Sequence, residues 1–444
     1  MSDLQLQPIS KPFTATVTPP GSKSLTNRAL VLAALADGIS DVGNVLFADD
    51  TLVMVECLTR LGFHLHVDRD EKLVRVHGRG GRIDRASAEL FCGNSGTTMR
   101  FLTAMCTLGR GTYTLDGVPR MRQRPIGQLV EVLQNLGARI ESTMEHGFPP
   151  LRIHADGLPG GIARFGAGLS SQFLSAILLA APHARNEVRI DLDPPLTSWP
   201  YVVMMMRLMD EFANTPELIR DPNTALPTRL IVPRGAYRAT SLQIEPDATA
   251  ATYFLAAAAI NEGSRVTIER LGKRSLQGDV RFADVLHKMG ASLLFGNDFI
   301  TITGTDVFEG IDIDLSDMPD CAQTLAVACL FAAGESILRG LHTLRHKETD
   351  RLSALATELR KMGADVAVTD DALTITPPEH VRPAAIDTYD DHRMAMSFAV
   401  AGTRVPVVIR NAECVNKTYP EFFEDLDRAS HSSAKHQTDR QHDA

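Results

Sequence analysis

The chain repeats one pattern at intervals of about 73 residues, and this period limits the folds it can adopt more than any other feature. In each copy, a helix ends at a glycine and is followed by two short segments of alternating apolar and polar residues. The glycines are Gly62, Gly137, Gly290 and Gly363, which lie 75, 153 and 73 positions apart. Glycine readily takes the left-handed conformation that ends helices, and the alternation predicts a hairpin. The middle interval spans two periods, and a degenerate copy with Ala213 at the glycine position fills it.

A second pattern places a small or polar residue before an apolar, alanine-rich helix and a strand. It starts at Ser22, Asn94, Ser170, Pro246, Pro319 and Tyr389, with steps of 72, 76, 76, 73 and 70 residues. Six units that mix helices and strands predict an α+β repeat protein. Helices that are apolar on all sides are buried ones, and six copies divide naturally into two domains of three units each. The segment 233–247 is the expected crossover between the domains.

The overall charge and the cysteines exclude several classes of protein. The 444 residues carry 45 basic and 54 acidic side chains, a net charge of −9, which argues against a dedicated nucleic-acid binder. The six cysteines form no CxxC pair, the first residues show no signal architecture, and no apolar run approaches about 18 residues. We therefore expect a cytoplasmic protein without membrane segments. The polar end, residues 431–444, is predicted to be disordered.

The stretch PPGSKSLTNRALVLAALADG, residues 19–38, predicts an anion site at a helix start. Ser22 or Ser24 can cap the helix, whose free N–H groups and dipole favour an anion beside Lys23 and Arg28. It is not a nucleotide P-loop, because Ser22 stands where that motif requires glycine before the lysine. The alternative is an ordinary capped helix with solvated basic residues. If the units of each domain are related by rotation, their helices open on one face, and two opposed faces form a positive cleft.

Eight motifs carry a resemblance to a known family. In chain order they are PGSKSLTNRALVLAALADG, CGNSGTTMRFL, MRQRPIGQLVEVLQNLGA, SSQFLSAILLA, PDCAQTLAVACLFA, HKETDRLSALATELRKMGADV, YDDHRMAMSFAV and NKTYPEFFEDL. Together they resemble the EPSP synthases, a family of enolpyruvyl transferases. The resemblance implies two similar domains, each of three βαβαββ units around buried parallel helices. It also implies that the N-terminal strand returns to the C-terminal domain, which gives domain limits of 22–241 for one and of 1–21 with 242–430 for the other.

The resemblance implies transfer of the enolpyruvyl group of phosphoenolpyruvate to the 5-hydroxyl of shikimate 3-phosphate, with release of phosphate. This addition and elimination belongs to the shikimate pathway of aromatic amino-acid biosynthesis. The implied partners are the two small-molecule substrates, with no cofactor, no metal, no nucleic acid and no membrane, and the protein is expected to be a monomer.

The resemblance also assigns roles to single residues. The expected catalytic groups are Lys23, Asp320 and Glu348, and the sequence leaves open which of them is the general base. The expected contacts of phosphoenolpyruvate are Lys23, Asn94, Gly96, Thr97, Arg124, Gln172, Arg351, Arg393 and Lys417. The expected contacts of shikimate 3-phosphate are Lys23, Ser24, Arg28, Ser170, Ser171, Gln172, Ser198, Tyr201, Asp320, Thr343 and Lys347. Thr343 departs from the family pattern, since many members carry asparagine there.

Three alternatives give different predictions. A UDP-N-acetylglucosamine enolpyruvyl transferase is expected to carry a lysine–asparagine pair at the first helix start and a cysteine in the loop near Arg120. This chain has Lys23–Ser24 and the cysteine-free segment GVPRMRQRP. An inactive anion-binding homologue is expected to lose charges in the cleft, whereas Lys23, Asp320 and Glu348 are all present. A metal-dependent phosphohydrolase needs a ligand cluster, and Asp391 with His392 alone is a weak one.

Overall fold

The computed structural model describes residues 3–432, whose strands form six small sheets. Five sheets have four strands and the sixth has three. In every sheet two strands lie parallel, and one of them also pairs with an antiparallel neighbour. The shared pairing scheme confirms the six α+β units predicted from the period of the sequence.

Three of these sheets come from the first part of the chain. Their strands are β3 (Asp37–Gly43), β4 (His64–Asp68), β5 (Leu73–Arg79), β6 (Ser87–Phe91), β7 (Arg110–Asp116), β8 (Ile140–Ser142), β9 (Leu151–Asp156), β10 (Gly161–Phe165), β11 (Val188–Leu192), β12 (Glu217–Arg220), β13 (Pro227–Val232) and β14 (Ser241–Gln243). The orders are β14-β3-β5-β4, β6-β7-β9-β8 and β10-β11-β13-β12. We call this part of the molecule the N lobe.

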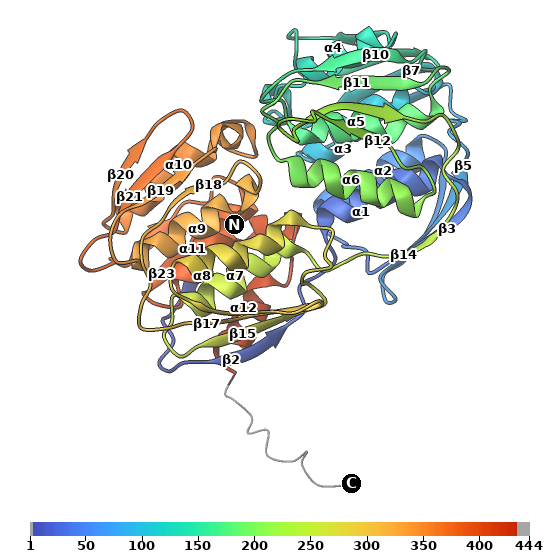
Figure 1. Cartoon of the computed structure of the whole chain (residues 1–444). Helices are drawn as coiled ribbons and strands as arrows, with labels where there is room; N and C mark the ends of the chain where they lie inside the picture. The colour runs from blue at the N-terminus through green and yellow to red at the C-terminus, as the bar shows by residue number, and fades with distance from the viewer. Residues whose placement is uncertain (1–2, 433–444) are drawn as a thin grey trace.

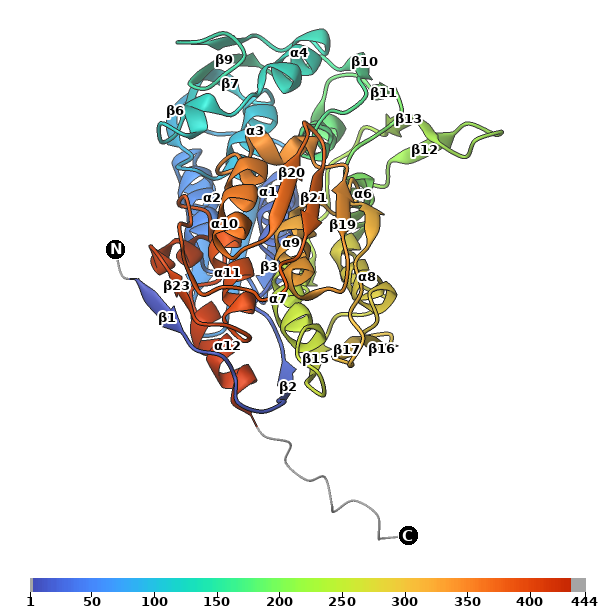
Figure 2. The same cartoon turned by 90° about the vertical axis from the view of Figure 1, so that its left-hand side faces the viewer.

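The other three sheets combine the last part of the chain with its first strands. Their strands are β1 (Leu4–Leu6), β2 (Thr14–Val17), β15 (Arg265–Glu269), β16 (Ser292–Phe295), β17 (Phe299–Thr303), β18 (Asp312–Asp314), β19 (Ser336–Arg339), β20 (Asp365–Val368), β21 (Leu373–Thr376), β22 (Ala384–Ile386) and β23 (Val407–Ile409). The orders are β16-β17-β15-β2, β18-β19-β21-β20 and β1-β23-β22. We call this part the C lobe. Figure 2 shows β1 beside β23, although they lie at opposite ends of the chain.

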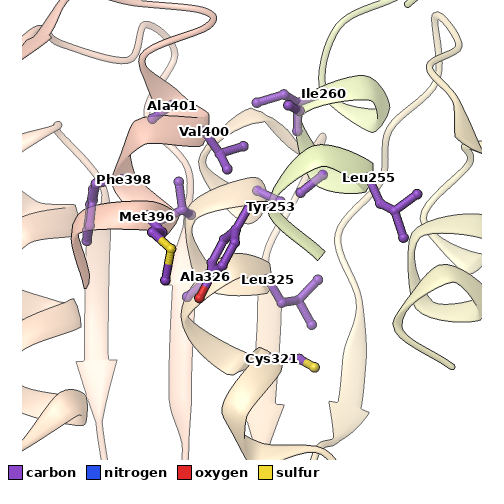
Figure 3. Packing of buried hydrophobic residues seen from close by; sticks show 14 of the residues in the cluster. Tyr253, Leu255, Ile260, Cys321, Leu325, Ala326, Met396, Phe398, Val400 and Ala401 are labelled. Atoms are coloured by element: carbon purple, nitrogen blue, oxygen red, sulfur yellow. The ribbon is translucent and has the colours of Figure 1, made fainter. Parts of the chain in front are cut away.

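In each lobe, the sheets and the outer helices surround a group of central helices (Figure 1). The buried helices are α1 (Lys23–Leu35), α3 (Gly96–Cys106) and α5 (Ser171–Ala180) in the N lobe, and α7 (Ala248–Ala259), α9 (Ala322–Ala328) and α11 (His392–Ala401) in the C lobe. All residues of α3 and α7 are buried, as expected for helices that are apolar on all sides. Figure 3 shows Tyr253 of α7, Leu325 of α9 and Met396 of α11 gathered in the core of the C lobe.

Five of the six outer helices, all but α12, end where the glycine pattern predicted. They are α2 (Asp49–Arg60), α4 (Gly127–Asn135), α6 (Trp199–Glu211), α8 (Phe282–Lys288), α10 (Arg351–Lys361) and α12 (Phe422–Ser430). The four repeat glycines after α2, α4, α8 and α10 have φ between +92° and +117°. Ala213 follows α6 with φ +59°, so the degenerate copy keeps the turn although its residue has a Cβ.

Two separate core clusters support the proposed division into domains. One contains buried residues from Leu25 to Ile244, and the other contains Phe13 and Ala15 with residues from Ala248 onward. The limits 22–241 for one domain and 1–21 with 242–430 for the other remain a proposal. The strand β14 (Ser241–Gln243) crosses the limit between 241 and 242, and it pairs with β3 of the N lobe. The tail predicted to be disordered begins at residue 431, and the carbonyl oxygen of Ser432 in it accepts a hydrogen bond from the amide of Thr14 at 3.2 Å. Residues 433–444 lie outside the described part of the chain.

Within residues 3–432, no helix combines the length and the apolar character needed to cross a lipid bilayer.

Candidate active site

The starts of the buried helices meet between the two lobes. In the N lobe, Lys23 opens α1, Thr97 is the second residue of α3 and Ser171 opens α5. In the C lobe, Asp320 lies in the 3-10 helix η4 (Pro319–Cys321) that leads into α9, and Arg393 is the second residue of α11. All five residues line two adjoining cavities. The predicted convergence of helix starts is therefore present in the structure.

Short polar side chains hold these helix starts in place. Ser22 accepts a hydrogen bond from the amide of Leu25, and Ser170 caps α5 in the same way. The caps of α3 and α7 are Ser95 and Asp247, one residue after the starts predicted at Asn94 and Pro246. Capping leaves the remaining free N–H groups of each first turn directed at the cavities, where they favour an anion.

The larger cavity has a volume of about 510 Å³ and is lined by both lobes. Every residue predicted to contact shikimate 3-phosphate lines it, namely Lys23, Ser24, Arg28, Ser170, Ser171, Gln172, Ser198, Tyr201, Asp320, Thr343 and Lys347. The Thr343 hydroxyl is buried and has no hydrogen-bond partner within residues 3–432. This free hydroxyl is available to a ligand, although it reaches less far from the backbone than an asparagine amide would.

A smaller cavity of about 20 Å³ shares five lining residues with the larger one, Lys23, Thr97, Gln172, Asp320 and Lys347. Of the residues predicted to contact phosphoenolpyruvate, its lining includes Lys23, Gly96, Thr97, Arg124, Gln172, Arg351 and Arg393. The remaining two, Asn94 and Lys417, lie directly behind this lining. The carbonyl oxygen of Asn94 accepts hydrogen bonds from Nζ of Lys417 at 2.9 Å and from Nη1 of Arg124 at 3.0 Å.

Asp320 sits among three cations where the cavities join. Its carboxylate oxygens lie 3.1 Å from Nη2 of Arg393 and 3.3 Å from both Nζ of Lys347 and Nη1 of Arg351. Burial alone raises the pKa of a carboxyl group, but these cations outweigh it and hold the pKa of Asp320 below its ordinary value. Asp320 is therefore an anion with its oxygens directed into the site.

Glu348 is the second buried carboxylate of the site. Its Oε2 accepts a hydrogen bond from Nη2 of Arg351 at 2.9 Å, and its Oε1 lies 3.8 Å from both Arg124 and Lys417. Burial raises the pKa of Glu348, but Arg351, Arg124 and Lys417 together lower it by more. The pKa of Glu348 is therefore well below its ordinary value. The contact with Arg351 is the helical i, i+3 pair expected from the sequence, but it is buried in the site rather than exposed on a helix surface.

Three residues to which the sequence reasoning assigned no substrate contact or catalytic role complete the charge network. Asp50, at the start of α2, lies 3.3 Å from Nζ of Lys23 and 2.9 Å from Nζ of Lys417. Arg100 of α3 donates to Oε1 of Gln172, and Asp391 accepts from Nε of Arg351 at 2.7 Å. The only signal for Asp50 is an acidic pair at a helix start, which is common at helix N-termini.

Cations outnumber carboxylates around the two cavities. The lining cations are Lys23, Arg28, Arg100, Arg124, Lys347, Arg351 and Arg393, and the lining carboxylates are Asp50, Asp320 and Glu348. Seven positive charges against three give a locally positive site in a chain whose net charge is −9. No group of three histidine, cysteine or acidic side chains within residues 3–432 is arranged to hold a metal ion. The arrangement suits a ligand, or a pair of ligands, with several negative charges.

Comparison with known proteins gives the family. The family model described as EPSP synthase (3-phosphoshikimate 1-carboxyvinyltransferase) matches residues 8–426, nearly the whole chain. This chain belongs to the EPSP synthase family. The resemblance drawn from eight motifs and the α+β fold class are thus confirmed.

Relatives of this chain include bacterial and plant proteins. The 3-phosphoshikimate 1-carboxyvinyltransferase of Sulfurovum sp. (strain NBC37-1) is 46% identical over 97% of this chain and the whole of that protein. The chloroplastic enzyme of Arabidopsis thaliana is 44% identical over 96% of this chain and 84% of its own length. Among solved structures, EPSP synthase from Acinetobacter baumannii superposes with a TM-score of 0.79 at 28% identity, covering 97% of this chain and 98% of the other. An enolpyruvyl transferase from Streptomyces tendae shares the fold, with a TM-score of 0.76 at 18% identity over 96% and 97% of the two chains.

Proposed function

We infer that this protein transfers the enolpyruvyl group of phosphoenolpyruvate to the 5-hydroxyl of shikimate 3-phosphate, releasing phosphate. The observation that carries this inference is the pair of adjoining cavities in which cations from both lobes converge. Each substrate carries a phosphate and a carboxylate, and guanidinium groups bind both with paired hydrogen bonds. Membership of the EPSP synthase family supplies the identity of the two anions.

The larger cavity receives shikimate 3-phosphate, and the smaller one receives phosphoenolpyruvate. At about 20 Å³ the smaller cavity has room for about one water molecule, because its cations are drawn onto Glu348 and Asp50. The phosphate and carboxylate of phosphoenolpyruvate take the place of these carboxylates as partners of Arg124, Arg351 and Lys417. The site thus opens as its internal ion pairs are exchanged for contacts with the substrate.

The reaction needs proton transfers in both directions. In the addition step, the 5-hydroxyl oxygen bonds to C2 of phosphoenolpyruvate, loses its proton, and a proton is delivered to the C3 methylene. In the elimination step, a proton leaves the new methyl group, the C2–O bond to phosphate breaks, and the double bond is restored. In this proposal Asp320 accepts the hydroxyl proton, while Glu348 and Lys23 serve the methylene carbon and the departing phosphate.

The cations around Glu348 suppress its proton affinity while no substrate is bound. Arg124, Lys417 and Arg351 all lower its pKa, and all three belong to the expected phosphoenolpyruvate contacts. When the substrate anions engage these cations, the field on Glu348 weakens and its pKa rises toward the range in which a carboxyl group can both donate and accept a proton. Substrate binding therefore prepares the acid–base group.

A phosphate-release assay tests this function. We expect phosphate only when shikimate 3-phosphate and phosphoenolpyruvate are both present. Release from phosphoenolpyruvate alone would indicate a hydrolase, and turnover with UDP-N-acetylglucosamine in place of shikimate 3-phosphate would indicate the related transferase. An absence of release with any combination would indicate an inactive homologue.

We further propose that the protein acts as a cytoplasmic monomer. Both cavities are lined by residues of one chain, so the site needs no second copy to be complete. All six cysteines are free, and five of them are buried, which fits a reducing compartment. Analytical ultracentrifugation with and without substrates tests the oligomeric state.

A further inference from the structure

Arg120 of the N lobe binds the main chain of the C lobe beside the active site. It precedes the 3-10 helix η1 (Met121–Gln123), and its side chain is half-buried. Nη2 donates to the carbonyl oxygen of Lys347 at 2.9 Å, and Nε donates to that of Glu348 at 3.1 Å. Nη2 also lies 3.5 Å from the carbonyl oxygen of Arg345. One guanidinium thus holds three carbonyl groups of the opposite lobe.

The carbonyls that Arg120 binds belong to a segment without regular structure. They follow or end the 3-10 helix η6 (His342–His346), where the last carbonyls of a helix have no partner inside it. The planar guanidinium presents five N–H donors in a fixed fork, which suits several carbonyls converging from one side. No other residue type supplies this geometry from a single side chain, and lysine offers one nitrogen with rotatable donors.

The same segment carries an expected substrate contact, Lys347, and a group of the proposed chemistry, Glu348. Lys347 contacts Asp320 at 3.3 Å, and Glu348 contacts Arg351 at 2.9 Å. Arg120 itself lines neither cavity. Its Nη1 also donates to Oε1 of Gln123 at 3.3 Å, and Gln123 does line the larger cavity. Arg120 therefore touches the supports of the site rather than the ligand space.

We propose that Arg120 is a positioning residue that makes the placement of Lys347 and Glu348 depend on contact between the lobes. When the lobes separate, the guanidinium leaves and the segment 345–348 loses its anchor. When they meet, the anchor fixes the acid–base group where phosphoenolpyruvate binds. This coupling confines proton transfer to the closed site, where water is excluded. The kinetic test of this proposal rests on the proposed function, whereas the hydrogen-exchange test does not.

The test compares Arg120→Ala and Arg120→Lys with the control Arg122→Ala. Arg122 lies in the same loop, is exposed, and pairs only with Asp116 of its own lobe, at 2.9 and 2.6 Å, among the contacts of the described residues. We expect kcat of Arg120→Ala to fall about tenfold to a hundredfold, the range for lost hydrogen bonds from a charged donor. KM for shikimate 3-phosphate is expected to rise less than kcat falls, because Lys347 is one of eleven expected contacts of that substrate, whereas Glu348 serves the chemistry directly. Arg120→Lys is expected to recover part of the rate.

Hydrogen exchange supplies the second readout. Amides of residues 342–350 are expected to exchange faster in Arg120→Ala than in the wild type, with and without shikimate 3-phosphate, while Arg122→Ala matches the wild type. An Arg120→Ala variant with the rate and exchange of the control would overturn the proposal. Slow turnover with unchanged exchange at 342–350 would also overturn it and would indicate a direct contact with ligand. If the wild type releases no phosphate, the proposed function fails, and the exchange comparison still decides the role of Arg120.

Discussion

Replacing Asp279 with asparagine is expected to stabilise the protein at neutral pH. Asp279 lies in the 3-10 helix η3 (Gly278–Arg281) and is buried between the lobes. Its oxygens accept hydrogen bonds from the hydroxyl of Tyr201 at 3.0 and 2.9 Å and from that of Thr249. Both donors are neutral hydroxyls, so the carboxylate is buried without a contacting cation among the described residues.

The magnitude follows from the pKa of Asp279. Burial raises it from the ordinary 3.8 to about 6; the neighbouring Asp320 adds to the rise, and the two hydroxyls and Arg393 oppose it. Below pH 4 the carboxyl group is mostly protonated in the folded state, and its burial costs little. As the pH rises through about 6 it ionises in the folded protein, and stability is lost because the unfolded chain ionises more easily. A difference of about two pH units corresponds to about 3 kcal/mol at pH 7 and above.

Urea unfolding between pH 4 and pH 8 measures this effect. The difference in free energy of unfolding between Asp279→Asn and the wild type is expected to be small near pH 4 and to grow by about 3 kcal/mol in favour of the variant by pH 7. The comparison cancels the other titrating groups. Asp284→Asn is the control, since Asp284 of α8 is only half-buried and its pair with Arg281 contributes about 0.5 kcal/mol or less. A difference that stays constant across the pH range would refute the reasoning.

Three further substitutions test the site and the fold. Gly96→Ala places a methyl group 2.6 Å from Nη2 of Arg124 and 3.2 Å from Nη1 of Arg100. The inhibition constant of phosphoenolpyruvate mimics such as glyphosate is therefore expected to rise at least about tenfold. A rise of less than about twofold would contradict the steric argument. Glu348→Gln is expected to lower kcat at least about a hundredfold and to abolish the exchange of solvent hydrogen into the methylene group. The control Glu335→Gln, at an exposed residue, is expected to leave kcat unchanged. Equal kcat values for the two variants would show that Glu348 takes no part in the chemistry. Ala213→Gly is expected to raise the free energy of unfolding by about 0.5 to 1 kcal/mol, because the exposed Ala213 has a positive φ that glycine adopts more easily. A lower free energy of unfolding in urea would contradict this.

The repeat units were predictable because their signals are local. A glycine at the end of a helix and an alternating hairpin act within about 20 residues, and each copy reports the same unit independently. Even the degenerate copy at Ala213 keeps the positive φ that the pattern predicts. The buried helices were equally clear, since residues such as those of α7 are apolar on every side.

The charge network was less accessible from the sequence, because its contacts join distant segments. Lys417 meets Asn94 across 323 positions, and Arg120 meets Lys347 across 227. The family motifs supplied the residues on the cavity lining. They gave no reason to single out Asp50 or Asp279, whose importance comes from what the fold places beside them.

The pairing of the first strands sets the order in which the chain can be completed during synthesis. Thr14 of β2 pairs with Arg265, and Leu4 of β1 pairs with Ile409, so both strands are synthesised long before their partners. The intervening N lobe emerges whole in the meantime, with its entry and exit held together by the amide of Ser22 on Glu245 and that of Asp247 on Pro20, both at 2.8 Å. A nascent chain therefore carries two unpaired strands, β1 and β2, while most of this sequence is being synthesised, and unpaired strands are exposed to aggregation during that time.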